Sequence, residues 1–68
     1  MFPSADLCRS QESHHRARAA GTLLENVRTV ATVAANAWGK EAVLAEGREA
    51  RRERTLQVRE AAAREAAC

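Results

Sequence analysis

The chain has 68 residues, with eleven Lys and Arg against nine Asp and Glu, which gives a net charge of +2. A chain of this length buries only about 60% of the surface that its unfolded form exposes, so it forms one small domain at most. Sixteen residues are alanine, and neither isoleucine nor tyrosine is present. This composition excludes a multidomain enzyme, an aromatic-lined ligand cavity and a β-sheet protein. Because alanine, arginine and glutamate all favour helices, we expect an all-α protein.

The uncharged segments are too short to cross a membrane. The longest of them runs from Thr29 to Gly39 and has eleven residues, whereas a membrane-spanning helix needs about 20. The first residues show no basic start followed by an apolar stretch, so we expect no secretion signal. The sequence therefore predicts a cytoplasmic protein without a membrane partner. In that compartment, Cys8 and Cys68 are expected to be reduced thiols.

A first helix is predicted from about Ala5 to Ala20. Ser4 precedes it as an N-cap residue, since its hydroxyl can accept a hydrogen bond from a free backbone N–H. Gly21 is expected to end the helix in the left-handed conformation. One face of this helix carries Leu7, Cys8, Gln11 and His15. The face expected to pack on a second helix carries Ser10, Ser13, Ala17 and Ala20.

A second helix is predicted from about residue 22 to residue 46. The segment Thr22–Leu23–Leu24–Glu25 has the pattern of a capping box, in which Thr22 and Glu25 each accept from a backbone N–H of the first turn. Because this start follows a glycine directly, the two helices should form an antiparallel hairpin over residues 1–46. A charged helical extension is expected over residues 47–68, continuous with the second helix or kinked near Gly47.

The second helix carries an apolar stripe at helical spacing, which we expect to form the core and the partner interface. Its members are Leu23, Leu24, Val27, Val30, Ala31, Ala34, Ala37, Trp38, Leu44 and Ala45. The residues predicted to contact a partner are Leu24, Val27, Ala31, Ala34 and Trp38. A hairpin of this size has few large apolar side chains, so covering the stripe by self-association or by another protein helix would stabilise it.

An arginine-rich stretch in the extension offers an alternative function. Nucleic-acid binding would use the four arginines of this stretch, namely Arg48, Arg51, Arg52 and Arg54. The glutamates interspersed among them would face phosphates unfavourably, and no leucine heptads follow as in a basic-region zipper. A solvated charged helix is the competing interpretation.

The chain shows no convincing catalytic or metal-binding motif. Cys8, Glu12 and His15 lie at i, i+4 and i+7, which would place three ligands on one helix face. No second Cys and His pair stands near them, and a Cys8–His15 nucleophilic pair would lack an orienting group. We therefore expect no enzymatic activity, no metal, no cofactor and no small-molecule substrate.

Three segments carry a resemblance. They are Cys8-Arg9-Ser10-Gln11-Glu12, Leu24-Glu25-Asn26-Val27-Arg28, and Ala37-Trp38 with Glu41-Ala42-Val43-Leu44-Ala45-Glu46. The region from about residue 7 to residue 50 is similar to short uncharacterised open reading frames of GC-rich alphaproteobacteria of the sphingomonad kind. The resemblance implies a bacterial cytoplasmic source and no particular activity. The function expected from the residues is that of a small helical interaction protein that forms a homodimer.

Overall fold

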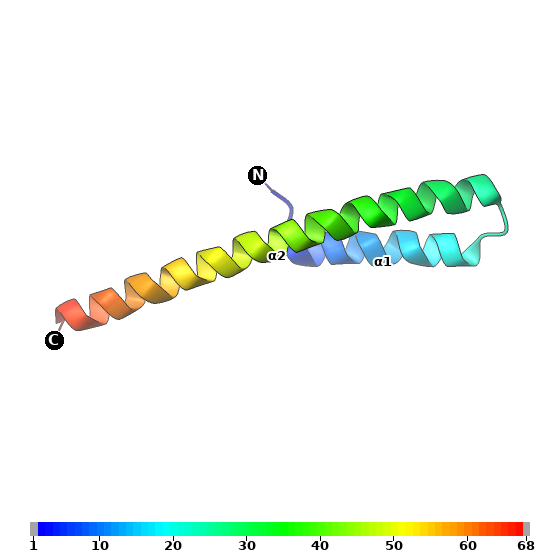
Figure 1. Cartoon of the computed structure of the whole chain (residues 1–68). Helices are drawn as coiled ribbons and strands as arrows, with labels where there is room; N and C mark the ends of the chain where they lie inside the picture. The colour runs from blue at the N-terminus through cyan, green and yellow to red at the C-terminus, as the bar shows by residue number, and fades with distance from the viewer. Residues whose placement is uncertain (1, 68) are drawn as a thin grey trace.

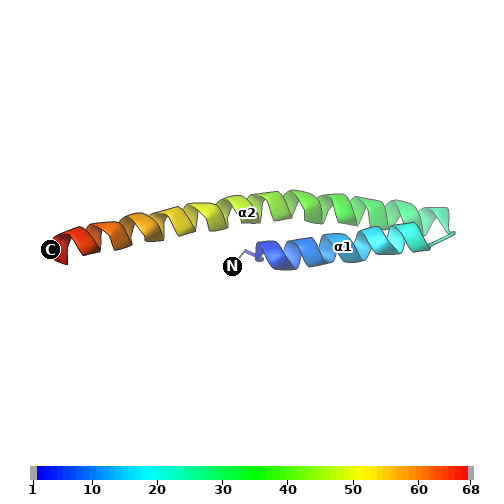
Figure 2. The same cartoon turned by 90° about the horizontal axis from the view of Figure 1, so that it is seen from below.

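The chain forms two helices joined by a short connection. The structure is a computed structural model that describes residues 2–67, in which α1 covers Ala5–Gly21 and α2 covers Glu25–Ala67. The predicted all-helical class is confirmed, and no strand occurs among these residues. Figures 1 and 2 show α1 lying along the first part of α2 in the opposite direction, while the rest of α2 continues alone. Cys68 lies outside the described residues.

The described chain is a rod and not a compact domain. Its extents are 65 × 15 × 14 Å, and its radius of gyration is 18.5 Å. A compact chain of this length would have a radius of gyration of about 11 Å. The difference arises because α2 has 43 residues and α1 only 17. We call Ala5–Gly21, the connection and the part of α2 up to residue 49 the hairpin, and residues 50–67 the arm.

The start of α1 agrees with the prediction, and its end does not. Ser4 is the N-cap residue, and its Oγ accepts a hydrogen bond of 3.2 Å from the Leu7 N–H. Gly21 remains part of the helix, and no glycine of the described residues has a positive φ. The expected left-handed stop is therefore wrong. The chain leaves α1 instead through Thr22, whose backbone is extended.

The predicted capping box at Thr22 is also wrong. α2 begins at Glu25, three residues later than expected, and Thr22, Leu23 and Leu24 form the connection. The Thr22 Oγ1 accepts instead from the Leu24 N–H at 3.1 Å, inside the connection. The Leu24 carbonyl then accepts the first helical hydrogen bond, from the Arg28 N–H at 3.0 Å. The connection therefore closes the hairpin with Leu23 left in solvent.

The core between the helices consists of small residues, of which Ala31 and Ala45 belong to the predicted stripe. The buried side chains are those of Ala5, Cys8, Ala31, Ala35, Ala42 and Ala45. Trp38 is half-buried and packs against the part of this core that contains Cys8. Large side chains at these positions would hold the helices apart, and alanine lets the backbones approach closely. The predicted core residues Leu24, Val30 and Leu44 are exposed.

The face of α1 that meets α2 also differs from the expectation. Ser10, Ser13, Ala17 and Ala20 are exposed. The buried or half-buried residues of α1 are Ala5, Cys8, Gln11, Glu12, His15 and Ala19, so that the face with Cys8 and His15 is the one covered. α2 runs through Gly39 and Gly47 without interruption, and the extension is continuous with it.

Candidate functional site

A row of apolar side chains remains uncovered on α2. Val30 is 67% exposed, Val33 64% and Leu44 56%. Together with the exposed Ala37 they recur at spacings of three, four and seven residues, so they share one helix face. This face lies away from the buried alanines Ala31, Ala35 and Ala42 and therefore away from α1. We call Val30, Val33, Ala37 and Leu44 the outer row.

The residues predicted to contact a partner lie in three different settings. Ala31 is buried under α1, and Trp38 is packed against the hairpin core. Val27 and Ala34 are half-buried, and Leu24 is exposed in the connection. The hairpin itself covers most of this set, and the outer row presents the apolar surface that is free. The predicted stripe combined Val30, Ala37 and Leu44 of the outer row with these covered residues, because the two sets are adjacent on the helix surface, and it left out Val33.

Ion pairs engage three arginines of the hairpin, and one of these pairs joins the two helices. Arg9 contacts Glu12 on α1 and Glu46 on α2, each at 2.9 Å, and Arg16 contacts Glu12 at 2.8 Å. Hydrogen bonds from Arg16 and Arg9 hold the pKa of Glu12 below its usual value. The hydrogen bond from Arg9 likewise lowers the pKa of Glu46 and the two carboxylates raise the pKa of Arg9. This cluster ties the two helices together through charge.

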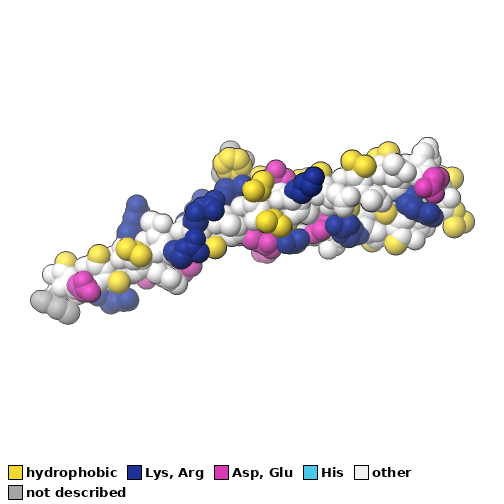
Figure 3. Space-filling model, in the orientation of Figure 1, with side chains coloured by type: hydrophobic (Ala, Val, Ile, Leu, Met, Phe, Trp, Pro, Cys, Tyr) yellow, Lys and Arg dark blue, Asp and Glu magenta, His cyan; other side chains and the backbone are white. Residues whose placement is uncertain are grey.

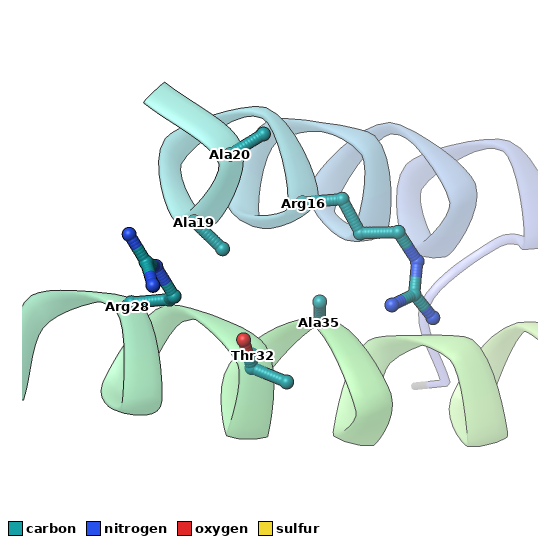
Figure 4. A pocket seen from close by; sticks show the side chains of 6 residues that line it. All are labelled: Arg16, Ala19, Ala20, Arg28, Thr32 and Ala35. Carbon is teal, nitrogen blue, oxygen red and sulfur yellow. The ribbon is translucent and has the colours of Figure 1, made fainter. Parts of the chain in front are cut away.

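A shallow groove of about 480 Å³ lies between the helices near the connection. Figure 4 shows Ala19 and Ala35 facing each other across it, with Arg16 reaching from α1 towards α2 and Arg28 beyond Ala19. Both guanidinium groups are already engaged, Arg16 with Glu12 and Arg28 with Glu25 at 3.3 Å. The groove therefore has no free cation with which to hold an anionic ligand.

The arginines that were predicted to contact nucleic acid lie where α2 leaves α1. Arg51, Arg52 and Arg54 are exposed, and none of them is in an ion pair within the described residues. Arg48 stacks on the ring of Phe2, with its Cζ 4.3 Å from the ring centroid, and its Nη2 has no hydrogen-bond partner. Figure 3 shows basic side chains gathered in a row across this part of the rod.

The candidate metal ligands on α1 do not form a site. No group of three or more His, Cys, Asp or Glu side chains in residues 2–67 is arranged to hold a metal ion. Cys8 is completely buried among alanines, and Glu12 is bound to arginines. His15 lies against the His14 ring with its Nδ1 buried and unpartnered. These side chains are components of the helix interface.

No helix among the described residues is apolar over a length that would cross a bilayer. Comparison of the chain with protein-family models, curated proteins and solved structures gave no match. The resemblance to alphaproteobacterial reading frames therefore stays a prediction. Two surfaces remain from which a function can be argued. They are the outer row and the exposed arginines Arg51, Arg52 and Arg54.

Proposed function

We propose that this protein is a helical interaction module that binds a second copy of itself through the outer row of α2. One observation carries the proposal: the hairpin uses alanines for its core and leaves the larger aliphatic side chains of α2 in solvent. A contiguous exposed apolar surface on a small protein is typical of an interaction site. The face concerned is the one opposite α1, so pairing through it leaves the hairpin intact.

The spacing of the outer row fits a second helix. Val30, Val33, Ala37 and Leu44 follow the alternation of three and four residues that lets side chains of one helix interdigitate with those of another. Lys40 occupies the remaining position of this pattern, and its ammonium group can extend to the edge of the contact while its methylenes pack. Ala37 at the centre allows close approach of the two backbones.

A second copy is the partner that the charges favour. The part of the chain over residues 2–46 has five basic and five acidic side chains, so two hairpins carry no net charge and do not repel each other. The outer row itself presents the same apolar surface on both copies, as a symmetric interface requires.

The expected affinity is modest. Full burial of a valine or leucine contributes about 1.5–3 kcal/mol, so covering the exposed part of three such side chains on each copy contributes about 6–12 kcal/mol. Association itself costs about 4–15 kcal/mol in lost translational and rotational freedom. Because the two ranges overlap, dimer formation should depend on concentration in the micromolar range and above.

Light scattering behind size exclusion over a concentration series tests the proposal. The expected mass rises from 7.4 kDa towards twice that value as the concentration increases. Leu44→Glu should raise the dissociation constant at least about tenfold, because it replaces an apolar side chain of the contact by a charged one. Val43→Glu is the matched control, since Val43 is the neighbouring residue, is 61% exposed and points to a different face.

The two variants distinguish pairing through the outer row from association through any exposed apolar side chain. An unchanged dissociation constant for Val43→Glu beside a weakened Leu44→Glu would support pairing through this face. A chain that stays at 7.4 kDa at millimolar concentration would overturn the proposal. Equal weakening by both variants would overturn the assignment of the face.

A further inference from the structure

The net positive charge of the protein lies on the far part of α2. Residues 47–67 contain six arginines and four glutamates, whereas residues 2–46 are neutral. All four ion pairs of the described residues lie within the hairpin, at Arg9, Arg16 and Arg28. None of the described ion pairs involves an arginine beyond residue 47, and this segment carries a net charge of +2.

The arginines and glutamates of this segment lie on different faces of the helix. Arg48, Arg52 and Arg59 follow each other at spacings of four and seven residues, with Arg51 one turn after Arg48, so these four side chains share one face. The glutamates also form a row at spacings of four and seven, at positions 49, 53 and 60. At 100° per residue, the mean directions of the two rows differ by about 120°. These three glutamates thus lie outside the face that the arginines present, and the fourth, Glu65, follows six residues after Arg59.

The glutamates of the opposite row have other contacts. Glu49 accepts the Ala5 N–H at 2.8 Å, at the start of α1. Glu53 accepts from the Gln57 Nε2 at 3.3 Å on its own helix. Neither carboxylate forms an ion pair with an arginine of the described chain. The interspersed glutamates, which from sequence argued against phosphate binding, are therefore turned away from the arginine face.

The arginine side chains border an open groove on the arm. This groove, of about 600 Å³, is lined by Arg51, Arg54, Thr55, Val58 and Arg59. Val58 and Thr55 lie among the arginines, and the Thr55 hydroxyl donates to the Arg51 carbonyl at 3.0 Å. Three guanidinium groups around a groove without a carboxylate favour an anionic ligand. Arginine can bind phosphate oxygens in a bidentate manner.

We propose that the arginine face of α2, formed by Arg48, Arg51, Arg52 and Arg59, binds the phosphate backbone of double-stranded DNA without regard to sequence. From Arg48 to Arg59 the row is about 16 Å long, at 1.5 Å per residue. This length matches about five base pairs, over which the duplex presents one phosphate per about 1.7 Å. An isolated helix with its side chains is about 10–12 Å wide and fits the major groove of B-form DNA, whereas the major groove of duplex RNA is too narrow.

The arm is free to enter a groove because α1 ends its contact at Glu49. Its helix continues from a segment that is already packed in the hairpin, so the unfavourable nucleation step is not repeated. No side chain of residues 51–67 is buried. The arginine face is present on a single copy, and DNA binding does not depend on self-association through the outer row.

Fluorescence anisotropy with a labelled 20-base-pair DNA duplex of mixed sequence tests this proposal on the full chain. With about four phosphates contacted, the affinity should fall on the order of 100-fold between 50 and 200 mM salt. The double substitution Arg51→Gln/Arg59→Gln should weaken binding about 60-fold at 0.1 M salt and lower the salt dependence by about two contacts. Glutamine has a helix propensity close to that of arginine, so helicity should be retained.

The matched control is Arg18→Gln/Arg64→Gln, which changes the net charge equally. Arg18 is exposed on α1, and Arg64 points away from the arginine row. This control should lose less than about threefold in affinity. No anisotropy change at 0.1 mM protein in 50 mM salt would overturn the proposal, and so would equal losses in the two double variants. Preference for single-stranded over duplex DNA would overturn the assignment of the ligand.

Discussion

The Ala5 N–H donates a hydrogen bond of 2.8 Å to the Glu49 Oε2, although 44 residues separate the two in sequence. This carboxylate lies at the N-terminus of α1, where free N–H groups and the helix dipole favour a negative charge. The contact fixes how far α1 reaches along α2. It also marks the residue beyond which α2 continues alone, so it separates the neutral hairpin from the basic arm.

Replacing Glu49 should therefore destabilise the hairpin. We expect Glu49→Ala to lower the free energy of unfolding by about 1 kcal/mol, because the Ala5 N–H loses its acceptor and the helix N-terminus loses a charge. Urea unfolding followed by the fluorescence of Trp38, the single tryptophan, measures the loss. Glu53→Ala, one turn further along, should change stability by less than about 0.5 kcal/mol. Equal effects would show that the contact does not hold α1 in place.

Acid should weaken the hairpin through Glu12 and Glu46. Because their pKa values are lowered in the folded chain by Arg16 and Arg9, both carboxylates favour folding in the charged form. Their contribution is complete above the ordinary pKa of about 4.3 and is lost as the pH falls through the lower, folded value. The urea concentration at which the Trp38 fluorescence shows half of the protein unfolded should therefore decrease once the pH drops below about 4.3.

The variant Glu12→Gln identifies the carboxylate responsible. It should be less stable than the wild type at pH 7 and should show a flatter dependence of stability on pH in the acid range. Glu65→Gln is the control, since Glu65 is exposed on the arm and forms no ion pair within residues 2–67. An acid dependence that is identical in Glu12→Gln and the wild type would contradict the role of the cluster.

The helices could be predicted from sequence, but the face that forms the core could not. Ser4 and the alanine-rich composition were sufficient to place α1, because capping and helix propensity are local properties. The predicted stripe of α2 included the buried Ala31 and Ala45 as well as the exposed Val30 and Leu44, and it left out Ala35 and Ala42. Packing between two helices depends also on how closely the backbones approach, and alanine permits the closest approach. The alanines of the core recur at spacings of four, seven and three residues, which is the signal that could have identified them.

Most of the arginines of the arginine face could be recognised from sequence, but whether the neighbouring glutamates pair with them could not. The four arginines from Arg48 to Arg54 can be counted in the chain, whereas the partners of the glutamates between them follow only from the packing. Glu49 is taken up by the start of α1, a contact across 44 residues. Arg59 joins the row by helical spacing alone and was missed because it lies outside the stretch of dense charge.

Two glycines inside α2 should respond differently to alanine. Gly47→Ala should stabilise the protein by about 1 kcal/mol through helix propensity, since the added Cβ would meet its nearest neighbour, Arg51 Nη1, at an ordinary 3.5 Å. Gly39→Ala should give a smaller gain or none, because its Cβ would lie 2.8 Å from the Glu12 Oε2 and displace that carboxylate from Arg16. Thermal unfolding followed by circular dichroism compares the two. A larger gain at Gly39 would contradict the close approach of Glu12.

Enlarging a buried alanine should separate the helices while leaving α2 helical. Ala42 is fully buried and belongs to the core cluster with Cys8, so Ala42→Leu should lower the free energy of unfolding by about 1–3 kcal/mol through overpacking. The neighbouring Val43→Leu should have an effect within about 0.5 kcal/mol, since its side chain is in solvent. Urea unfolding monitored by Trp38 fluorescence distinguishes the two, because the indole packs on this same cluster. If Ala42→Leu were instead neutral or stabilising, the two helices would not be in close alanine contact, and the larger side chains of α2 would have to supply the core.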